Sequence, residues 1–201
     1  MKKDGKADST IETAVTRLRR LSNLCNIQEP EELKETLAKL DWSNNTKRSI
    51  VIYLNGFLKY LDKHWEPPKY KADNKLPFIP TEEELNSLIS ASPQMISTLL
   101  QFLKETGARI GEAMKLEWTD LDLERRTAHI TPEKYSNPRI LPLGNTLINM
   151  LNSLPRKNEF VFYPKYKTIR ESYRYNRNKT AKKLKNPRLK KITFHTFRHW
   201  K

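Results

Sequence analysis

The sequence has little of what several large classes of proteins require. Cys25 is the single cysteine of its 201 residues, so an intramolecular disulfide is excluded, and its apolar neighbours favour a small core residue over a nucleophile. No apolar run reaches the roughly 18 residues that a membrane-spanning helix needs, and residues 1–20 lack the apolar core of a secretory signal. We therefore expect a cytoplasmic protein that makes no use of a membrane.

Acidic residues are scarce in one part of the chain. The net charge is +15, and residues 155–201 hold 16 lysines and arginines against two acidic residues. A segment of one sign repels itself unless an anion lies against it. We expect a polyanionic partner, with nucleic acid first, ahead of a basic tail that serves only solubility.

Clusters of metal-ligating residues are also missing. The four histidines are scattered along the chain, and none has a cysteine or an acidic cluster beside it at metal-ligand spacing: His64, His129, His195 and His199. We expect neither a metal nor another cofactor.

Apolar residues recur at helical spacing in the first third of the chain. The pattern predicts three helices, over residues 9–27, 30–40 and 43–61. Pro30 suits a first helical turn, and the sequence SNN at 43–45 offers N-cap residues. These helices predict a small bundle, residues 1–65, of a size suited to clamping a partner.

Residues 66–80 contain four prolines and show no periodicity, which predicts a linker. A second domain, residues 81–201, begins at the capping-box sequence Thr81 to Glu84. Its patterns predict strands over 127–131, 139–143 and 159–163, helices over 145–154 and 168–184, and a further helix from His195. The expected fold class is mainly α with a small β-sheet, a helical bundle joined to a partial α+β domain.

The segment TGARIGEAMKLEWTDLD, residues 106–122, places an arginine just after a glycine that can end a helix. Gly107 predicts a turn, and a short helix follows it. Arg109 and Glu112 are three apart on that helix, where their side chains can meet. Spacing alone leaves open whether they form a surface ion pair or part of a site.

Two other segments carry cationic residues at suggestive positions. His195 and Arg198 form H-x-x-R, so both can point to one side of a helix. Lys134 and Arg139 stand before and after the turn of the predicted hairpin, from which a long side chain can reach over a neighbouring groove.

These segments together resemble the boxes of the tyrosine recombinase (phage integrase) family. Residues 106–122 resemble T-G-x-R-x-x-E followed by L-x-W-x-D, ITPEKYSNPRILPL resembles the hairpin K-x-x-x-x-R-x-x-P-L, and FHTFRHW resembles H-x-x-R-H. The resemblance covers about residues 10–201. It implies that residues 1–65 are a DNA-binding core-binding domain and that residues 81–201 are the front part of a catalytic domain.

The resemblance implies a role for each matching residue. Arg109 and Arg198 bind the scissile phosphate, where arginine suits the charge that develops in the transition state. Lys134 acts as general acid for the leaving 5′ oxygen, and His195 contacts the phosphate and helps proton transfer. Glu112 orients Arg109. This mechanism needs no metal.

Several of these residues also have ordinary structural interpretations. Arg109 could be a buried salt-bridge partner, and Lys134 a solvated hairpin lysine. We interpret His199 and Trp200 as packing residues. Four tyrosines are interpreted as surface or base-stacking aromatics rather than as a nucleophile: Tyr163, Tyr166, Tyr173 and Tyr175.

The basic segment predicts contacts to double-stranded DNA from Arg170, Arg174, Arg177, Lys179, Lys182 and Lys183. The family's nucleophilic tyrosine follows a further box, L-G-H, and the 201 residues contain neither. We therefore expect an integrase fragment from a mobile element that binds DNA, does not cleave it alone, and belongs to a parent that assembles on DNA as a homotetramer. The alternatives are a non-catalytic DNA-binding protein or regulator, and an RNA-binding protein.

Overall fold

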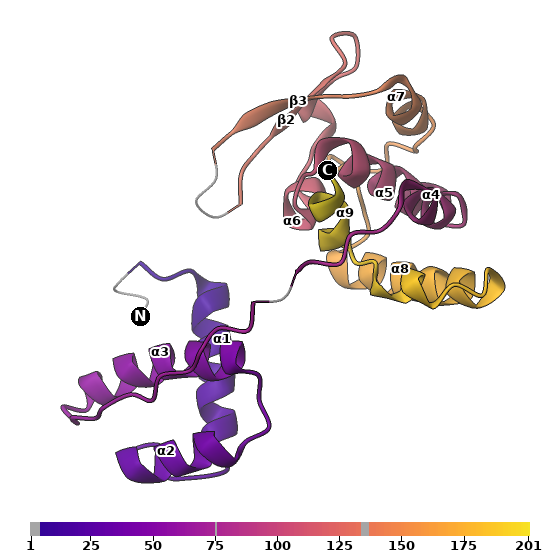
Figure 1. Cartoon of the computed structure of the whole chain (residues 1–201). Coiled ribbons are helices and arrows are strands. Elements are labelled where there is room, and N and C mark those ends of the chain that lie inside the picture. The colour runs from indigo at the N-terminus through magenta and orange to yellow at the C-terminus, as the bar shows by residue number, and fades with distance from the viewer. Residues whose placement is uncertain (1–4, 75, 134–136) are drawn as a thin grey trace. The chain divides into compact units, whose positions relative to one another are not determined.

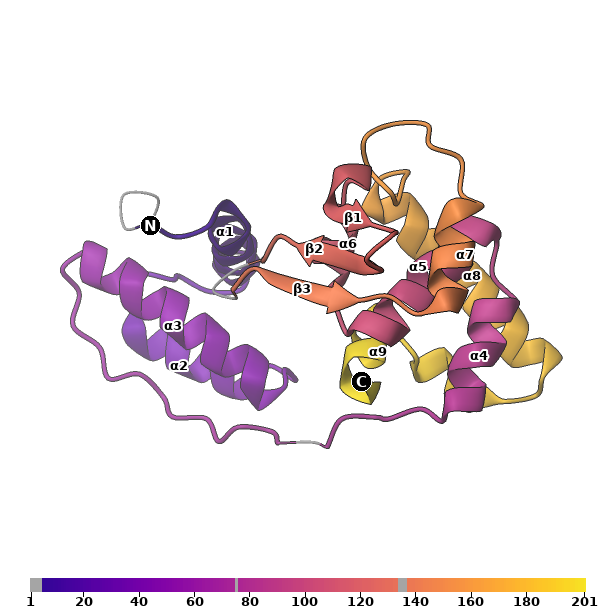
Figure 2. The ribbon, with the colours of Figure 1, turned by 90° about the horizontal axis from the view of Figure 1, so that it is seen from above.

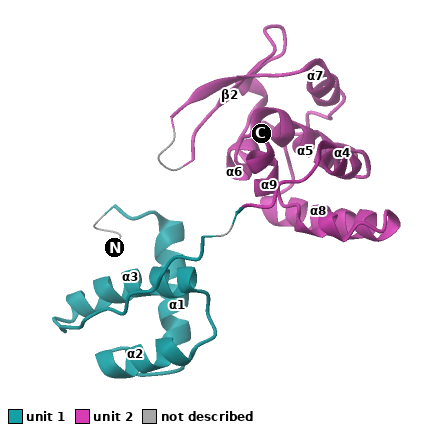
Figure 3. Ribbon diagram, in the orientation of Figure 1, with its two compact units in different colours: residues 1–76 teal, residues 77–201 magenta. Residues whose placement is uncertain are grey.

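The computed structural model describes residues 5–74, 76–133 and 137–201. It divides into two compact units, residues 1–76 and 77–201 (Figure 3).

The first unit is a bundle of α1 (Asp8–Ser22), α2 (Pro30–Lys39) and α3 (Asn44–Tyr60) (Figure 1). Its core is made of leucines at helical spacing, with no exposed surface at Leu21, Leu33, Leu37, Leu54 and Leu58. Ser43 caps α3 by accepting a hydrogen bond from the Thr46 N–H at 3.3 Å. The three predicted helices are present, although α1 ends at Ser22 instead of 27, where the chain turns and still buries Cys25.

Part of the predicted linker packs onto this bundle. Tyr70 of this segment, and Trp65 just before it, lie against the apolar core of the bundle. The Asp73 carboxylate accepts a hydrogen bond from the Asn44 N–H at 3.1 Å, at the N-terminus of α3, where a negative charge is favourable. The division between the units therefore falls at Leu76 and Pro77, near the end of the 66–80 segment.

The second unit surrounds a central helix, α5 (Gln94–Thr106). This helix contacts α4 (Glu82–Ser90), α6 (Ile110–Met114), α7 (Asn145–Asn152) and α9 (Phe194–Trp200). Leu99, Leu100, Phe102 and Leu103 are fully buried, as expected for a helix covered on several sides. The capping box at Thr81 is present. The Thr81 N–H donates to Glu84 Oε2 at 3.0 Å, and the Glu84 N–H donates to Thr81 Oγ1 at 3.2 Å.

A small antiparallel sheet, in the order β1-β2-β3, lies beside these helices (Figure 2). It comprises β1 (Leu121–Asp122), β2 (Thr127–Ile130) and β3 (Arg139–Pro142), with Ile130 paired to Arg139 at the open end of the hairpin. The 3-10 helix η1 (Trp118–Asp120) leads into it. The two predicted hairpin strands are confirmed. The two-residue strand β1 was missed because it is too short to show a pattern.

The last segment contains α8 (Tyr166–Lys183) and the 3-10 helix η2 (Pro187–Lys191), followed by α9. The predicted strand over 159–163 is wrong. Phe160 makes only an isolated bridge to Glu117, while Val161 and Phe162 are buried in the core. A short apolar run of this kind cannot be distinguished from a strand by periodicity alone. The prediction of a mainly α fold with a small sheet is confirmed.

None of the helices in the described ranges is both long enough and apolar enough to cross a membrane.

Candidate functional site

The turn between α5 and α6 determines where Arg109 lies. Gly107 has a positive φ of 61°, in the left-handed region that glycine adopts without strain, and this ends α5 as predicted. The Ala108 N–H donates to the Thr106 Oγ1 at 3.2 Å and holds the turn closed. Arg109 then begins α6 at its N-cap position, with extended backbone.

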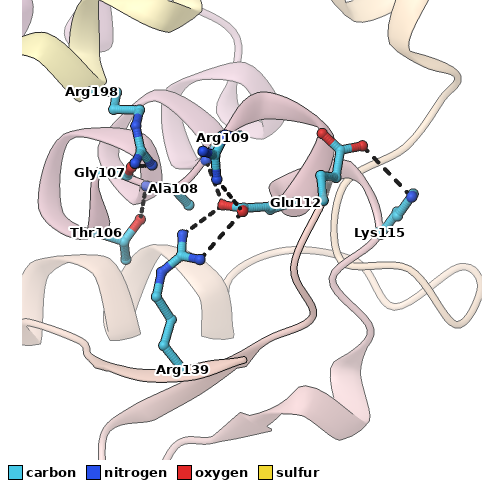
Figure 4. A network of polar contacts seen from close by, with 9 residues as sticks. Thr106, Gly107, Ala108, Arg109, Glu112, Lys115, Arg139 and Arg198 are labelled. Atoms are coloured by element: carbon cyan, nitrogen blue, oxygen red, sulfur yellow. Dashed lines mark hydrogen bonds and ion pairs between the residues drawn. The ribbon is translucent and has the colours of Figure 1, made fainter. Parts of the chain in front are cut away.

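Glu112 is a buried carboxylate shared by two arginines (Figure 4). Its side chain has 0% exposure, whereas those of Arg109 and Arg139 are 34% and 28% exposed. Oε1 accepts from Arg109 Nη1 at 3.0 Å and from Arg139 Nη1 at 3.3 Å. Oε2 accepts from the Arg109 backbone N–H at 2.8 Å and from Arg139 Nη2 at 2.6 Å. The carboxylate therefore holds both the backbone and the side chain of Arg109.

The charge of Glu112 is secured by these bonds. Burial alone would raise its pKa, but the hydrogen bonds from Arg139 and Arg109 outweigh that effect and lower the pKa to about 2. Glu112 is thus ionised at neutral pH. Arg139 was expected to reach over a groove, but in the structure it reaches across 27 residues of sequence to Glu112 instead. Local spacing carries no signal for such a contact.

Helix α9 brings Arg198 to the same turn. The Arg198 Nη1 donates to the Gly107 carbonyl oxygen at 2.8 Å, although the two residues are 91 apart in sequence (Figure 4). The helix packs directly on α5. Arg109 follows Gly107 by two residues, so the turn places the two predicted phosphate-binding arginines next to each other.

His195 lies one helical turn before Arg198 on α9. Its pKa is lowered, first by partial burial and then by the charges of His199, Arg198 and Arg109. It is therefore mainly neutral at neutral pH. The rings of His195 and His199 meet edge to face, with centroids 4.5 Å apart.

The two residues after Arg198 differ in their surroundings. His199 is exposed beside His195, so its interpretation as a packing residue is wrong. Trp200 does pack against the core, and the Lys104 ammonium lies 5.3 Å from its ring centre. The H-x-x-R-H motif thus points its last histidine toward the first and not into the core.

Lys134 lies outside the described residues, so its predicted role stays a prediction. The neighbouring part of the hairpin is described. The Glu133 carboxylate forms an ion pair with Lys115 at 3.6 Å, and a side chain at Gly111 would collide with that carboxylate. The hairpin therefore packs closely on α6, near Arg109.

The arginines of α8 line a cavity of about 380 Å³ that also borders His195 and Tyr166. Arg170 and Arg174 form ion pairs with Glu171. The remaining arginine of this group, Arg177, donates from Nη1 to the Ile192 carbonyl at 2.8 Å. Its buried Nε has no hydrogen-bond partner within the described ranges. An acceptor atom in the cavity would satisfy it.

The lysines predicted to bind DNA are placed differently from these arginines. Lys179, Lys182 and Lys183 are exposed near the C-terminal end of α8. They do not line the cavity beside His195. The six basic residues that the sequence grouped together are therefore divided between two surfaces.

The tyrosines are also divided. Tyr173 is buried, stacks on Phe194 at 4.7 Å and donates its hydroxyl to the Ile192 carbonyl at 3.0 Å. Its pKa is raised by burial, and its interpretation as a surface aromatic is wrong. Tyr166 is 43% exposed on the cavity, and Tyr175 is 67% exposed.

No group of three or more histidine, cysteine and acidic side chains within the described part of the chain is placed to hold a metal ion.

Cationic donors from a helix-ending turn and from α9 therefore meet at one place, an arrangement typical of sites that stabilise charge on a phosphoryl group. The model of the phage integrase family matches residues 80–200, and the chain belongs to this family. A comparison with curated proteins found no match.

Solved integrase structures have the same fold. The Tn1549 transposon integrase in complex with transposon right-end DNA aligns with a TM-score of 0.71 at 20% identity, over 98% of this chain and 80% of that one. Lambda integrase bound to DNA aligns with a TM-score of 0.70 at 12% identity, over 98% and 79%. A lambda integrase tetramer bound to a Holliday junction aligns with a TM-score of 0.74 at 11% identity, over 98% of this chain and 67% of that one. The predicted tyrosine recombinase family and fold are confirmed.

Proposed function

We propose that this chain binds duplex DNA and carries the phosphate-activating part of a tyrosine recombinase site. The observation that supports this most directly is the contact of Arg198 with the Gly107 turn, because it unites two distant arginines beside a histidine. The Tn1549 and lambda integrase structures named above, which share this fold, are bound to DNA.

In the proposed mechanism, Arg109 and Arg198 stabilise the charge that develops on the non-bridging oxygens of the scissile phosphate. Preorganised donors of this kind are each worth several kcal/mol, of the order of 3. Glu112 fixes Arg109, so little reorganisation is needed when the phosphate arrives. His195, neutral at neutral pH, can accept a proton, and Lys134 protonates the leaving 5′ oxygen.

Strand cleavage in this proposal requires a tyrosine from outside these 201 residues. Tyr173 is buried and hydrogen-bonded, which makes it unsuitable as a nucleophile. Tyr166 is the tyrosine to control for, because it lines the cavity beside His195. We therefore expect the chain alone to bind duplex DNA without forming a covalent phosphotyrosine bond.

A suicide DNA substrate tests this expectation. The chain should retard the duplex in a native gel and give no SDS-stable adduct. An adduct that disappears in the Tyr166→Phe variant would overturn the proposal that the nucleophile lies outside this chain. Absence of any retarded band would overturn the DNA-binding function itself.

The main rival is a non-catalytic DNA-binding protein built on the same fold. A separate downstream segment that carries the L-G-H box and the tyrosine should restore nicking if the site is functional. The control is the Arg198→Ala variant, which lacks an arginine proposed to bind the phosphate. The downstream segment should not restore nicking in this variant. Failure of the unaltered chain to nick under these conditions favours the rival.

The first unit takes the role of a core-binding domain in this proposal, and the second that of the front part of the catalytic domain. We further propose that the parent enzyme assembles as a tetramer on DNA, as the lambda integrase tetramer on a Holliday junction does. Sedimentation of this chain with and without a duplex tests whether these 201 residues suffice for assembly.

A further inference from the structure

The basic residues of the last segment differ sharply in what they contact. Its six arginines all have partners in the structure. Arg170 and Arg174 pair with Glu171, Arg188 with Glu84, Arg177 and Arg198 with backbone carbonyls, and Arg156 with the Trp118 ring. Each of these arginine side chains is therefore positioned by a contact within the second unit.

Three lysines, at the C-terminal end of α8 and in the turn and 3-10 helix that follow, have no such partners among the described residues. Lys182, Lys185 and Lys190 line an open groove of about 490 Å³ together with Asn178, Ala181 and Pro187. All three are exposed, and none forms an ion pair with a carboxylate of the described residues. We call this surface the lysine groove.

The fold builds this groove at one place. Lys185 has a positive φ of 49° and ends α8, and the chain turns back so that η2 packs on the helix. The Asn186 N–H donates to the Ala181 carbonyl at 3.0 Å across this turn. The turn thus places Lys190, from η2, opposite Lys182, from α8.

The lysine groove is separate from the arginine site. Arg177, the last arginine on the cavity beside His195, precedes Lys182 by five residues on α8, which is about 8 Å along the helix axis and about 140° around it. In Figure 1 the C-terminal end of α8 points away from α9. The arginines and Lys182 therefore face different sides of α8, and the cavity and the lysine groove share no lining residue.

We propose that the lysine groove is a second binding site for the phosphodiester backbone of duplex DNA, separate from the scissile phosphate. Ammonium groups on flexible stems neutralise phosphates as point charges, without the geometric demand of an arginine fork. The groove therefore adds affinity that is independent of sequence and sensitive to salt, whereas the arginines position the reacting phosphate. This inference rests on the proposed function of the chain.

The test compares two triple variants of the full chain that lose the same charge. Lys182→Gln, Lys185→Gln and Lys190→Gln remove the groove's charges. The control changes Arg125, Arg126 and Lys157 to Gln, exposed residues of the same unit that do not line the groove. Affinity for a 20 base-pair duplex is measured over a range of salt concentrations, and circular dichroism verifies that each variant is folded.

In the groove variant, log affinity should fall less steeply with log salt concentration. The magnitude of the slope should decrease by about 2 to 3, since each lost phosphate contact removes about 0.9. The affinity of the groove variant near 0.1 M salt should fall at least tenfold, and that of the control by much less. Equal losses in the two variants, or a weakened affinity for structured RNA with duplex binding intact, would overturn the proposal. Failure of the proposed function is distinguishable, because the unaltered chain would then not bind the duplex at all.

Discussion

At the scale of single residues, the buried carboxylate of Glu112 shows how much one side chain depends on its partners. A buried charge is costly unless it is hydrogen-bonded, and four donors satisfy this one. Two of the four come from Arg139, on the hairpin. The hairpin and the Arg109 turn are therefore coupled through one group.

The Arg139→Ala variant should lower the free energy of unfolding by about 1–3 kcal/mol, because Glu112 keeps its charge and loses two donors. Arg139→Lys should recover part of the loss. The control is Arg125→Ala, an exposed ion-pair residue, for which we expect about 0.5 kcal/mol or less. Urea unfolding measures these values, and equal stability of the two alanine variants would contradict a role for Arg139 in holding Glu112.

The same carboxylate predicts a pH dependence. A folded-state pKa of about 2, below the ordinary 4.5, means that ionised Glu112 stabilises the fold fully above pH 4.5. This stability is lost as the pH falls from 4.5 toward 2. The difference in unfolding free energy between the natural chain and Glu112→Gln should therefore shrink over that window. A difference that stays constant from pH 6 to pH 3 would show that the charge of Glu112 does not stabilise the fold.

The contact between His195 and His199 predicts a spectroscopic change. Charge on His199 is one of the causes that lower the pKa of His195, after partial burial. The His199→Gln variant should therefore raise the pKa of His195, measured from its ring proton shifts by NMR. The ring proton shifts of His129, on β2, should be the same in both proteins and serve as the internal control. An unchanged titration of His195 would mean that the two rings do not interact in solution.

At the scale of elements, the helix ends decide where the site forms. Gly107 ends α5 with left-handed backbone, and an added Cβ would lie 3.1 Å from the Lys201 side chain. Gly56, within α3, has open space around it and ordinary helical backbone. The two glycines should therefore respond oppositely to alanine.

Gly107→Ala should destabilise the second unit by about 1 kcal/mol and weaken duplex binding, because the turn supports Arg109 and Arg198. Gly56→Ala should stabilise the first unit by about 0.5–1 kcal/mol, since alanine is the better helix former. Thermal unfolding of the two variants shows whether each is less or more stable than the natural chain. A stabilising effect of Gly107→Ala would mean that the turn does not require its left-handed residue.

Local patterns were enough for most elements. The caps at Ser43 and Thr81 and the glycine at 107 are signals that act within four residues, and the structure has all three. The predicted strand over 159–163 failed because a buried run of three or four apolar residues fits several backbone conformations. The 3-10 helix η2 was not predicted, since its residues show no periodicity.

At the scale of the whole molecule, the chain consists of two units that meet at residues 76 and 77. Leu76 is 96% exposed, and Ile79 is 55% exposed. The Trp65, Tyr70 and Asp73 contacts hold the preceding residues to the first unit. The segment around Leu76 is therefore the expected site of proteolysis.

Limited trypsin digestion should cut first at the bond between Lys75 and Leu76, since Pro77 blocks cleavage after Leu76, and leave two folded fragments of about 75 and 126 residues. Lys179 is the internal control, because it is exposed but lies within a helix and should resist. Mass spectrometry identifies the cuts, and circular dichroism of the separated fragments tests their fold. Early cleavage within α8, or fragments that unfold, would contradict two independently folded units.

The sequence by itself determined the helices, the hairpin, the family and the positions of the arginine and histidine boxes, because these depend on short-range periodicity and on motifs of adjacent residues. Only the tertiary structure decided that Arg139 reaches Glu112, that Tyr173 is buried and that the arginines and lysines of α8 face different surfaces. Those contacts join residues 27 and 19 positions apart or depend on which side of a helix is covered. Packing of the whole unit selects them, and no local pattern encodes that choice.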